Sequence, residues 1–211
     1  MSEVEIIGTP ERTVTRRKFI MGVIATGAAT SSASYLFKGP QPLLGALMAQ
    51  GSVERLITLN VNGQQRRVDV MSQETLAFTL RYKLGLTGTK LGCDRAECGA
   101  CTVLINGVNS YACSVLTHSV RTSDIVTIEG LEAEDGTLHP VQQAVWDEGG
   151  FQCAFCAPGF IMSMVSMVEE NPNPTRAECA QALSGNLCRC ADYDKILTSA
   201  MRAAEYSRQQ A

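Results

Sequence analysis

The segment that decides the fold is Gly92-Cys93-Asp94-Arg95-Ala96-Glu97-Cys98-Gly99-Ala100-Cys101, in which three cysteines are spaced C-x4-C-x2-C. Cys113 extends this pattern to C-x4-C-x2-C-x11-C. A second tetrad, C-x2-C-x31-C-x-C, is formed by Cys153, Cys156, Cys188 and Cys190. Eight of the nine cysteines therefore fall into two groups, and four thiolates are enough to hold one metal centre.

The opening spacing of the first tetrad is that of plant-type ferredoxins, in which a short loop places three thiolates around a 2Fe-2S cluster. Glycines at positions 85, 88, 92 and 99 surround these thiolates and allow backbone N–H groups to approach sulfur closely. Zinc usually takes C-x2-C pairs, and disulfides impose no tight loop. Cys93, Cys98, Cys101 and Cys113 are therefore predicted to hold a 2Fe-2S cluster.

The second tetrad fits no ferredoxin loop. Cys153 and Cys156 lie just before a helix predicted to begin near Pro158, while Cys188 and Cys190 follow a Gly-Asn pair. We expect the four thiolates to meet where helix ends converge, because helix N-termini favour the negative charge of a cluster. The C-x2-C half also occurs in zinc knuckles, so spacing alone leaves zinc open. Two clusters in so short a chain would favour electron transfer over substrate chemistry.

The pattern of residues 50–130 predicts a β-grasp, ferredoxin-like domain. Segments 55–61 and 66–70 alternate as strands around an Asn62-Gly63 turn. Segment 74–84 has leucines four residues apart, which indicates a helix, and strands are expected at 101–106 and 125–128.

Residues 131–211 read as a helical bundle, beginning with an acidic, glycine-containing boundary at 131–140. Helices are expected over 140–148, from Pro158 through 160–168, over 175–183 with a Thr175/Glu178 capping box, and over 193–206. The predicted fold class is therefore α+β, an N-terminal β-grasp plant-type 2Fe-2S domain followed by a four-helix-bundle 2Fe-2S domain.

Residues 1–49 read as a leader. Thr15-Arg16-Arg17-Lys18-Phe19-Ile20 is a twin-arginine pattern, and residues 19–37 carry no charge. This export route carries folded proteins, which suits a cluster inserted in a reducing cytoplasm, so we expect a periplasmic protein. Cleavage is expected after Ala49 or after Ala33, and an uncleaved leader would act as a membrane anchor.

Composition limits the classes of partner. The chain has 211 residues, a mass of 22.7 kDa and a formal charge of −3. Residues 1–49 hold five basic and three acidic side chains, so the remainder carries −5. This acidic balance argues against a nucleic-acid partner, which would need a basic face.

Several conspicuous residues are expected to be structural. Cys179 is predicted to be a buried apolar side chain, and Trp146 to belong to the core of the first bundle helix. The three methionines at 162, 164 and 167 are expected to pack, and His118 and His139 to be structural or exposed.

The words around both tetrads closely resemble the iron-sulfur subunit of molybdenum hydroxylases, the xanthine and aldehyde oxidase family, and with the leader they suggest the periplasmic aldehyde oxidoreductase type. The matching segments are Leu86-Thr87-Gly88-Thr89-Lys90, Gly92-Cys93-Asp94, Cys98-Gly99-Ala100-Cys101-Thr102-Val103, Leu138-His139-Pro140-Val141-Gln142, Gln152-Cys153, Pro158-Gly159 and Ser184-Gly185-Asn186-Leu187-Cys188-Arg189-Cys190.

This resemblance implies that a separate large subunit binds a molybdopterin cofactor and oxidises aldehydes or N-heterocycles with oxygen from water. Electrons would leave through the bundle cluster and then the ferredoxin-like cluster. Residues matching Gln152 and Cys190 contact the pterin in relatives. A flavin subunit, a membrane-bound cytochrome c subunit or a small soluble carrier would accept the electrons. A free-standing ferredoxin-like carrier is the alternative from the residues alone, and a structural zinc module is a third.

Four residues depart from the family's usual pattern: Ala96, Ala154, Ala157 and Asp192. Ala96, Ala154 and Asp192 replace common glycines, and Ala157 a common threonine. Alanine costs little at a glycine position unless the backbone there is left-handed, and aspartate tolerates positive φ better than most residues. Small adjustments of geometry and potential are expected.

Overall fold

The computed structural model describes residue 15 and residues 17–26 and 55–210. The chain divides into two units, residues 1–52 and 53–211, and each is described by itself. Residues 17–26 form an exposed helix. Within the described ranges, no helix has both the length and the apolar character needed to cross a bilayer. Arg16 and both expected cleavage sites, after Ala33 and after Ala49, lie outside the described residues.

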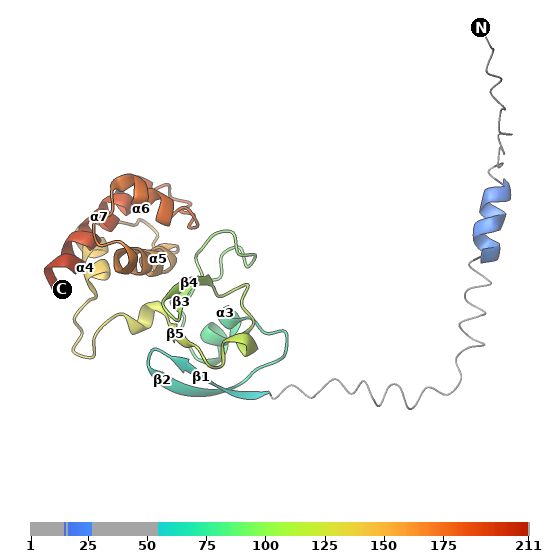
Figure 1. Cartoon of the computed structure of the whole chain (residues 1–211), viewed down its shortest axis with the longest axis horizontal. Coiled ribbons are helices and arrows are strands. Elements are labelled where there is room, and N and C mark those ends of the chain that lie inside the picture. The colour runs from blue at the N-terminus through green and yellow to red at the C-terminus, as the bar shows by residue number, and fades with distance from the viewer. Residues whose placement is uncertain (1–14, 16, 27–54, 211) are drawn as a thin grey trace, which may run out of the picture. The chain divides into compact units, whose positions relative to one another are not determined.

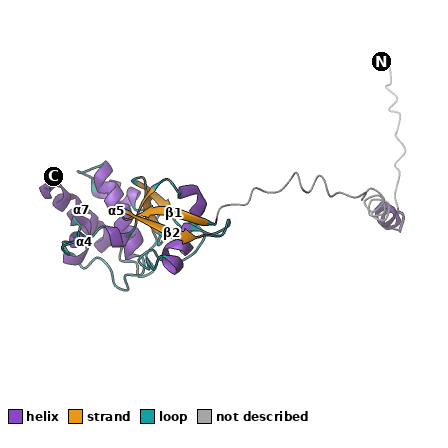
Figure 2. Cartoon of the chain, turned by 90° about the horizontal axis from the view of Figure 1, so that it is seen from below, coloured by secondary structure: helices purple, strands orange, loops and turns teal. Residues whose placement is uncertain are grey.

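A five-stranded mixed sheet forms the first half of the larger unit, with strand order β2-β1-β5-β3-β4 (Figures 1 and 2). The strands are β1 (Leu56–Val61), β2 (Gln64–Asp69), β3 (Thr102–Ile105), β4 (Val108–Tyr111) and β5 (Asp124–Val126). β1 pairs antiparallel with β2 and parallel with β5, which is antiparallel to β3. This arrangement confirms the predicted β-grasp architecture.

The two Asn-Gly turns take the backbone conformation that their sequence requires. Asn62 and Gly63 have φ of 54° and 70°, and Asn106 and Gly107 have φ of 51° and 80°. Two consecutive left-handed residues match the twist of a hairpin, which explains why these pairs join β1 to β2 and β3 to β4. The second hairpin contains β4, a strand that the sequence did not predict.

Two predicted elements differ in detail. The expected helix over 74–84 is a short α-helix, α3 (Leu76–Phe78), that widens into a π-helix, η1 (Thr79–Lys83). Leu76 and Leu80 are both buried, and their four-residue spacing does not distinguish the two helical types. The strand predicted to reach Ile128 ends at Val126, and Ile128 begins a 3-10 turn, η3 (Ile128–Gly130).

The second half consists of the four predicted helices: α4 (Pro140–Asp147), α5 (Ala157–Glu170), α6 (Arg176–Ala182) and α7 (Tyr193–Gln210). The Thr175/Glu178 capping box is present at α6. His139 caps α4, and its Nδ1 accepts a hydrogen bond from the Val141 N–H. Burial lowers the pKa of His139, which favours the neutral ring that this bond requires.

The core of the bundle is centred on α5. This helix is buried around most of its circumference, and Phe160, Met162, Met164 and Met167 are all buried, so the methionines pack as predicted. Cys179 is also buried, and its thiol contacts the sulfur of Met201 at 3.6 Å. The prediction for Trp146 was wrong, because its side chain is 77% exposed. The buried residues of α4 are Val141 and Ala144, and Trp146 points away from that stripe.

The two halves pack closely, with α5 against β3 (Figure 1). The tightest approach is at Gly159, in the first turn of α5, where a Cβ atom would collide with the carbonyl oxygen of Gly99. Three hydrogen bonds also cross this contact: Asn186 Nδ2 to Gly99 O at 3.0 Å, Tyr111 Oη to Gly185 O at 2.9 Å, and Leu187 N to Cys98 O at 2.9 Å.

Gly159→Ala tests this contact. In an isolated helix alanine is favoured over glycine by about 1 kcal/mol, whereas overpacking a close contact costs about 1–3 kcal/mol. We expect Gly159→Ala to lower the melting temperature and to loosen the two halves, measured by thermal unfolding and by proteolysis between them. Ser166→Ala, at a half-buried site of the same helix, is the control. An unchanged or raised melting temperature for Gly159→Ala would show that the contact is not tight.

Candidate cluster-binding sites

The loop between η1 and β3 carries Cys93, Cys98 and Cys101, and Cys113 follows β4 to complete the first tetrad. Its buried members are Cys101 and Cys113, and its half-buried members are Cys93 and Cys98. The N–H groups of Arg95, Glu97 and Cys98 donate to Cys93 Sγ at 3.3 to 3.4 Å. Ala96 N–H donates to Cys113 Sγ at 3.2 Å, and Cys93 N–H donates to Cys98 Sγ at 3.4 Å. The backbone thus presents its N–H groups to the sulfurs, as the glycine-rich sequence predicted.

The thiols of this loop have very different acidities. The three N–H donors lower the pKa of Cys93 to about 7. Burial raises the pKa of Cys101 to about 12, and the adjacent Cys113 thiol contributes in the same direction. Only thiolates bind iron, so Cys101 needs the positive charge of a metal to ionise, while the pKa of Cys93 lies close to neutral pH.

Helix ends gather the second tetrad, as predicted. Cys156 is the N-cap residue of α5, and Cys188 and Cys190 lie just before α7. Cys190 Sγ and Cys153 Sγ are 3.5 Å apart. Burial raises the pKa of Cys156 to about 12, with a further contribution from its hydrogen-bonding neighbour Cys188. Phe155 N–H lowers the pKa of Cys153, which is exposed.

The arrangement of donors fits a two-iron cluster. Thiols of the bundle tetrad come together in pairs, Cys153 with Cys190 and Cys156 with Cys188, and the two ions of a 2Fe-2S cluster each need two such ligands. A single zinc ion instead needs four donors at one point. Across the described residues, no three His, Cys, Asp or Glu side chains are placed around one point to hold a metal ion.

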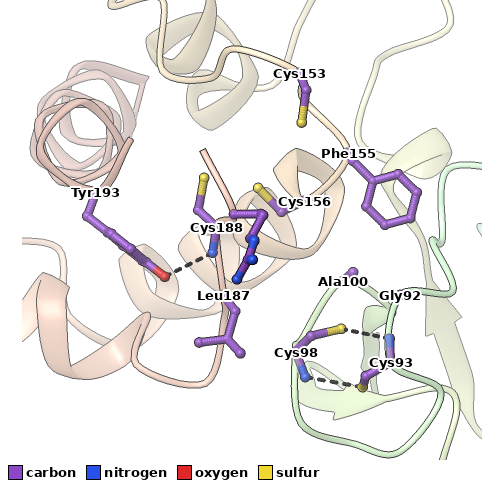
Figure 3. A pocket seen from close by; sticks show the side chains of 11 residues that line it. Gly92, Cys93, Cys98, Ala100, Cys153, Phe155, Cys156, Leu187, Cys188 and Tyr193 are labelled. Atoms are coloured by element: carbon purple, nitrogen blue, oxygen red, sulfur yellow. Dashed lines mark hydrogen bonds between the residues drawn. The ribbon is translucent and has the colours of Figure 1, made fainter. Parts of the chain in front are cut away.

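A cavity of about 370 Å³ separates the two tetrads (Figure 3). Cys93 and Cys98 line one side, and Cys153, Cys156 and Cys188 line the other. Tyr193 also lines this cavity, and its hydroxyl accepts a hydrogen bond from Cys188 N–H at 3.0 Å. Leu187 N–H donates to Cys98 O, which gives a backbone hydrogen bond between the two cysteine loops one residue from Cys188.

Sequence reasoning missed one interaction at the second tetrad. Gln152 donates twice to Asp192, from its backbone N–H to Oδ2 at 3.0 Å and from Nε2 to Oδ1 at 2.9 Å. Gln152 and Cys190 are the two residues expected to contact a pterin. Gln152 is exposed and Cys190 is half-buried, and both lie beside the bundle tetrad. The pairing of Asp192 with Gln152 has no sequence signal, because the two residues are forty positions apart.

Two of the departures from the family pattern fall where alanine is strained. Ala96 has φ of 58° and Ala154 has φ of 56°, so the exception noted for left-handed backbone applies to both. Asp192, the fourth departure, does not have a left-handed backbone. The left-handed residue there is its neighbour Ala191, with φ of 62°. Asp192 was therefore assigned the wrong role, because its side chain binds Gln152 and its backbone has no unusual φ.

The fold and the paired tetrads define an iron-sulfur protein with two centres. Two family models match: a 2Fe-2S iron-sulfur cluster binding domain over residues 59–123 and a [2Fe-2S] binding domain over residues 127–201. Each matched range contains one complete tetrad. These matches remove the zinc alternative that spacing left open for the second tetrad.

Curated relatives identify the class more closely. The chain is 44% identical over 147 residues to the nicotine 6-hydroxylase small subunit of Paenarthrobacter nicotinovorans, covering 70% of this chain and 88% of the relative. It is 38% identical over 200 residues to the aldehyde oxidoreductase iron-sulfur-binding subunit PaoA of Escherichia coli K12, covering 86% of each.

A solved structure, quinoline 2-oxidoreductase from Pseudomonas putida 86, matches with a TM-score of 0.70 and 36% identity, covering 74% of this chain and 98% of that one. The chain belongs to the iron-sulfur small subunits of the molybdenum hydroxylase family.

The strained backbone at Ala96 and Ala154 predicts that glycine at either position stabilises the protein. A left-handed non-glycine residue costs about 1–2 kcal/mol, and the added freedom of glycine in the unfolded chain returns about 0.4–1 kcal/mol of this. We therefore expect Ala96→Gly and Ala154→Gly each to stabilise the protein by roughly 0.5–1 kcal/mol, measured by thermal unfolding with clusters loaded. Ala133→Gly, at a loop residue whose φ is not positive, should destabilise it slightly. Equal effects at all three positions would contradict the strain.

Proposed function

We propose that this chain is the electron-transfer subunit of a heteromeric molybdenum hydroxylase. It takes electrons from a large molybdopterin-containing subunit that oxidises aldehydes or N-heterocycles with oxygen from water, and delivers them to an external acceptor. Membership of the small-subunit family supports this role. The observation that carries it is structural: both tetrads line one cavity and their loops are hydrogen-bonded to each other.

The geometry of the two loops supports the following assignment of cluster ligands. Cys93, Cys98, Cys101 and Cys113 hold the ferredoxin-like cluster, and Cys153, Cys156, Cys188 and Cys190 hold the bundle cluster. The clusters, when bound, supply two one-electron carriers. The chain itself supplies thiolates, directs N–H groups at sulfur and keeps the loops in register through the Leu187 to Cys98 hydrogen bond.

The bundle cluster is the one that faces the molybdenum subunit. Each tetrad has two buried cysteines, and of the other four Cys153 is exposed while Cys93, Cys98 and Cys190 are half-buried. The bundle tetrad is thus the one with an exposed thiol. Large exposed apolar side chains also lie near the bundle tetrad, namely Trp146, Phe155 and Leu187. Exposed apolar groups of this kind mark surfaces that another protein covers. Gln152 and Cys190 then contact the pterin of the large subunit.

The ferredoxin-like cluster passes electrons outward, to a flavin subunit or a membrane-bound cytochrome c subunit. The complex is periplasmic and is exported folded by the twin-arginine route. The twin-arginine motif at Arg16 and Arg17 supports this location. The match to the E. coli aldehyde oxidoreductase subunit covers 86% of this chain. Residues 50–211 alone make up a smaller share of the chain, so the match extends into the leader.

Metal content tests the function directly. The complex is recovered from its native cell envelope through a tag on this chain, and iron and molybdenum are measured together. We expect about one molybdenum per four irons if the partner adds no iron, because two 2Fe-2S clusters hold four. A gently recovered protein with iron and no molybdenum would instead support the free-standing ferredoxin-like carrier.

Cys190→Ser tests the order of the clusters. Serine is a poor substitute for a thiolate, so we expect the bundle-cluster signal in electron paramagnetic resonance to be lost or altered while the ferredoxin-like signal persists. Substrate should still reduce molybdenum, and electrons should remain there. Cys179→Ser, at a buried thiol outside both tetrads, is the matched control and should retain both signals. Loss of the ferredoxin-like signal in Cys190→Ser would refute the assignment.

A further inference from the structure

The Asp192 carboxylate is the buried charge nearest in sequence to the bundle tetrad, two positions after Cys190 and directly before α7. Its residue is only 9% exposed. Both carboxylate oxygens accept hydrogen bonds from the same residue, Gln152, at 3.0 and 2.9 Å. Gln152 directly precedes the ligand Cys153. The carboxylate is therefore hydrogen-bonded to the loop segment that carries one thiolate of the tetrad.

This carboxylate does not act as an ordinary helix cap. Aspartate at such a position usually accepts hydrogen bonds from the first N–H groups of its own helix. In the described part of the chain, the hydrogen bonds of the Asp192 side chain go to Gln152, and no lysine or arginine forms an ion pair with it. Burying a carboxylate without a cation is costly, so two N–H donors from Gln152 are the compensation that the fold provides.

The hydrogen bonds place the Asp192 carboxylate close to two ligands of the bundle cluster. Its Oδ2 lies 3.0 Å from the backbone nitrogen of Gln152, the residue next to Cys153, and Asp192 is itself two residues from Cys190. A negative charge in this place disfavours an added electron on a cluster that these thiolates hold. Asp192 is only 9% exposed, which limits the screening of its charge by water.

We propose that Asp192 is a positioning residue for the bundle cluster: clamped by the two N–H groups of Gln152, its carboxylate holds a fixed negative charge beside Cys153 and lowers the reduction potential of that cluster. This inference rests on the proposed function only in requiring that the bundle tetrad holds a 2Fe-2S cluster. A lower potential at this site speeds the onward transfer of electrons to the ferredoxin-like cluster.

The test is a redox titration of the purified complex, followed by electron paramagnetic resonance so that the two clusters are measured separately. Asp192→Asn keeps the shape and removes the charge, and we expect the midpoint potential of the bundle cluster to shift upward while that of the other cluster stays unchanged. Asp192→Glu retains the charge and should restore a midpoint closer to that of the unsubstituted protein. Asp194→Asn, which removes the charge of a side chain 94% exposed in the first turn of α7, should shift neither midpoint.

Three results would overturn the inference: an unmoved bundle midpoint in Asp192→Asn, an equal shift of both clusters, or an equal shift in Asp192→Glu. If Asp192→Asn fails to assemble, Asp192→Gly takes its place, because glycine also removes the charge and is common in the family at this position. Iron content and the presence of both signals are recorded first in the unsubstituted complex. Their absence there would count against the proposed function, whereas a normal complex with an unmoved midpoint would count against Asp192 alone.

Discussion

The hydrogen bond from Leu187 N–H to the carbonyl oxygen of Cys98 is the contact on which the arrangement of both sites depends, because it joins the two cysteine loops at residues adjacent to or within each tetrad. It forms only if α5 approaches the ferredoxin-like loop closely, and Gly159 permits this by leaving room for the Gly99 carbonyl. Asn186 bonds that same carbonyl from the other side. The separation of the two tetrads is therefore set by one backbone hydrogen bond, one side-chain hydrogen bond and the close contact at Gly159.

The two tetrads solve the same electrostatic problem in different ways. Four thiolates repel one another, and each loop must offset that repulsion before a cluster can bind. In the ferredoxin-like loop, backbone N–H groups point at Cys93 and Cys113, which requires the left-handed turns at Asp94 and Ala96. In the bundle, Cys156 sits at the N-terminus of α5, where the helix dipole favours negative charge. The strain of Ala96 is thus the cost of a donor directed at Cys113.

Much of this molecule follows from its sequence, because ligand spacing and turn chemistry are local. The two tetrads, the Asn-Gly hairpins and the four helices were all predicted. What sequence could not supply depends on contacts between distant segments. The four-residue leucine spacing does not separate an α-helix from the π-helix at Thr79, and helical propensity does not say that Trp146 faces outward. β4 was missed because Val108–Tyr111 is short and half polar, with no alternation to reveal it.

The same distinction explains why Asp192 was misjudged. From sequence, an aspartate in place of a family glycine suggests a backbone that needs positive φ, and aspartate is one of the residues that tolerates it. The structure places the left-handed residue one position earlier, at Ala191, so the backbone at residue 192 sets no such requirement. The aspartate is then free to be selected for its side chain, and its carboxylate contacts Gln152 on the opposite arm of the tetrad. The Asp192 carboxylate is buried, accepts hydrogen bonds at both oxygens and is bound to the residue next to the ligand Cys153. An effect on the cluster explains this placement better than a role in local folding does.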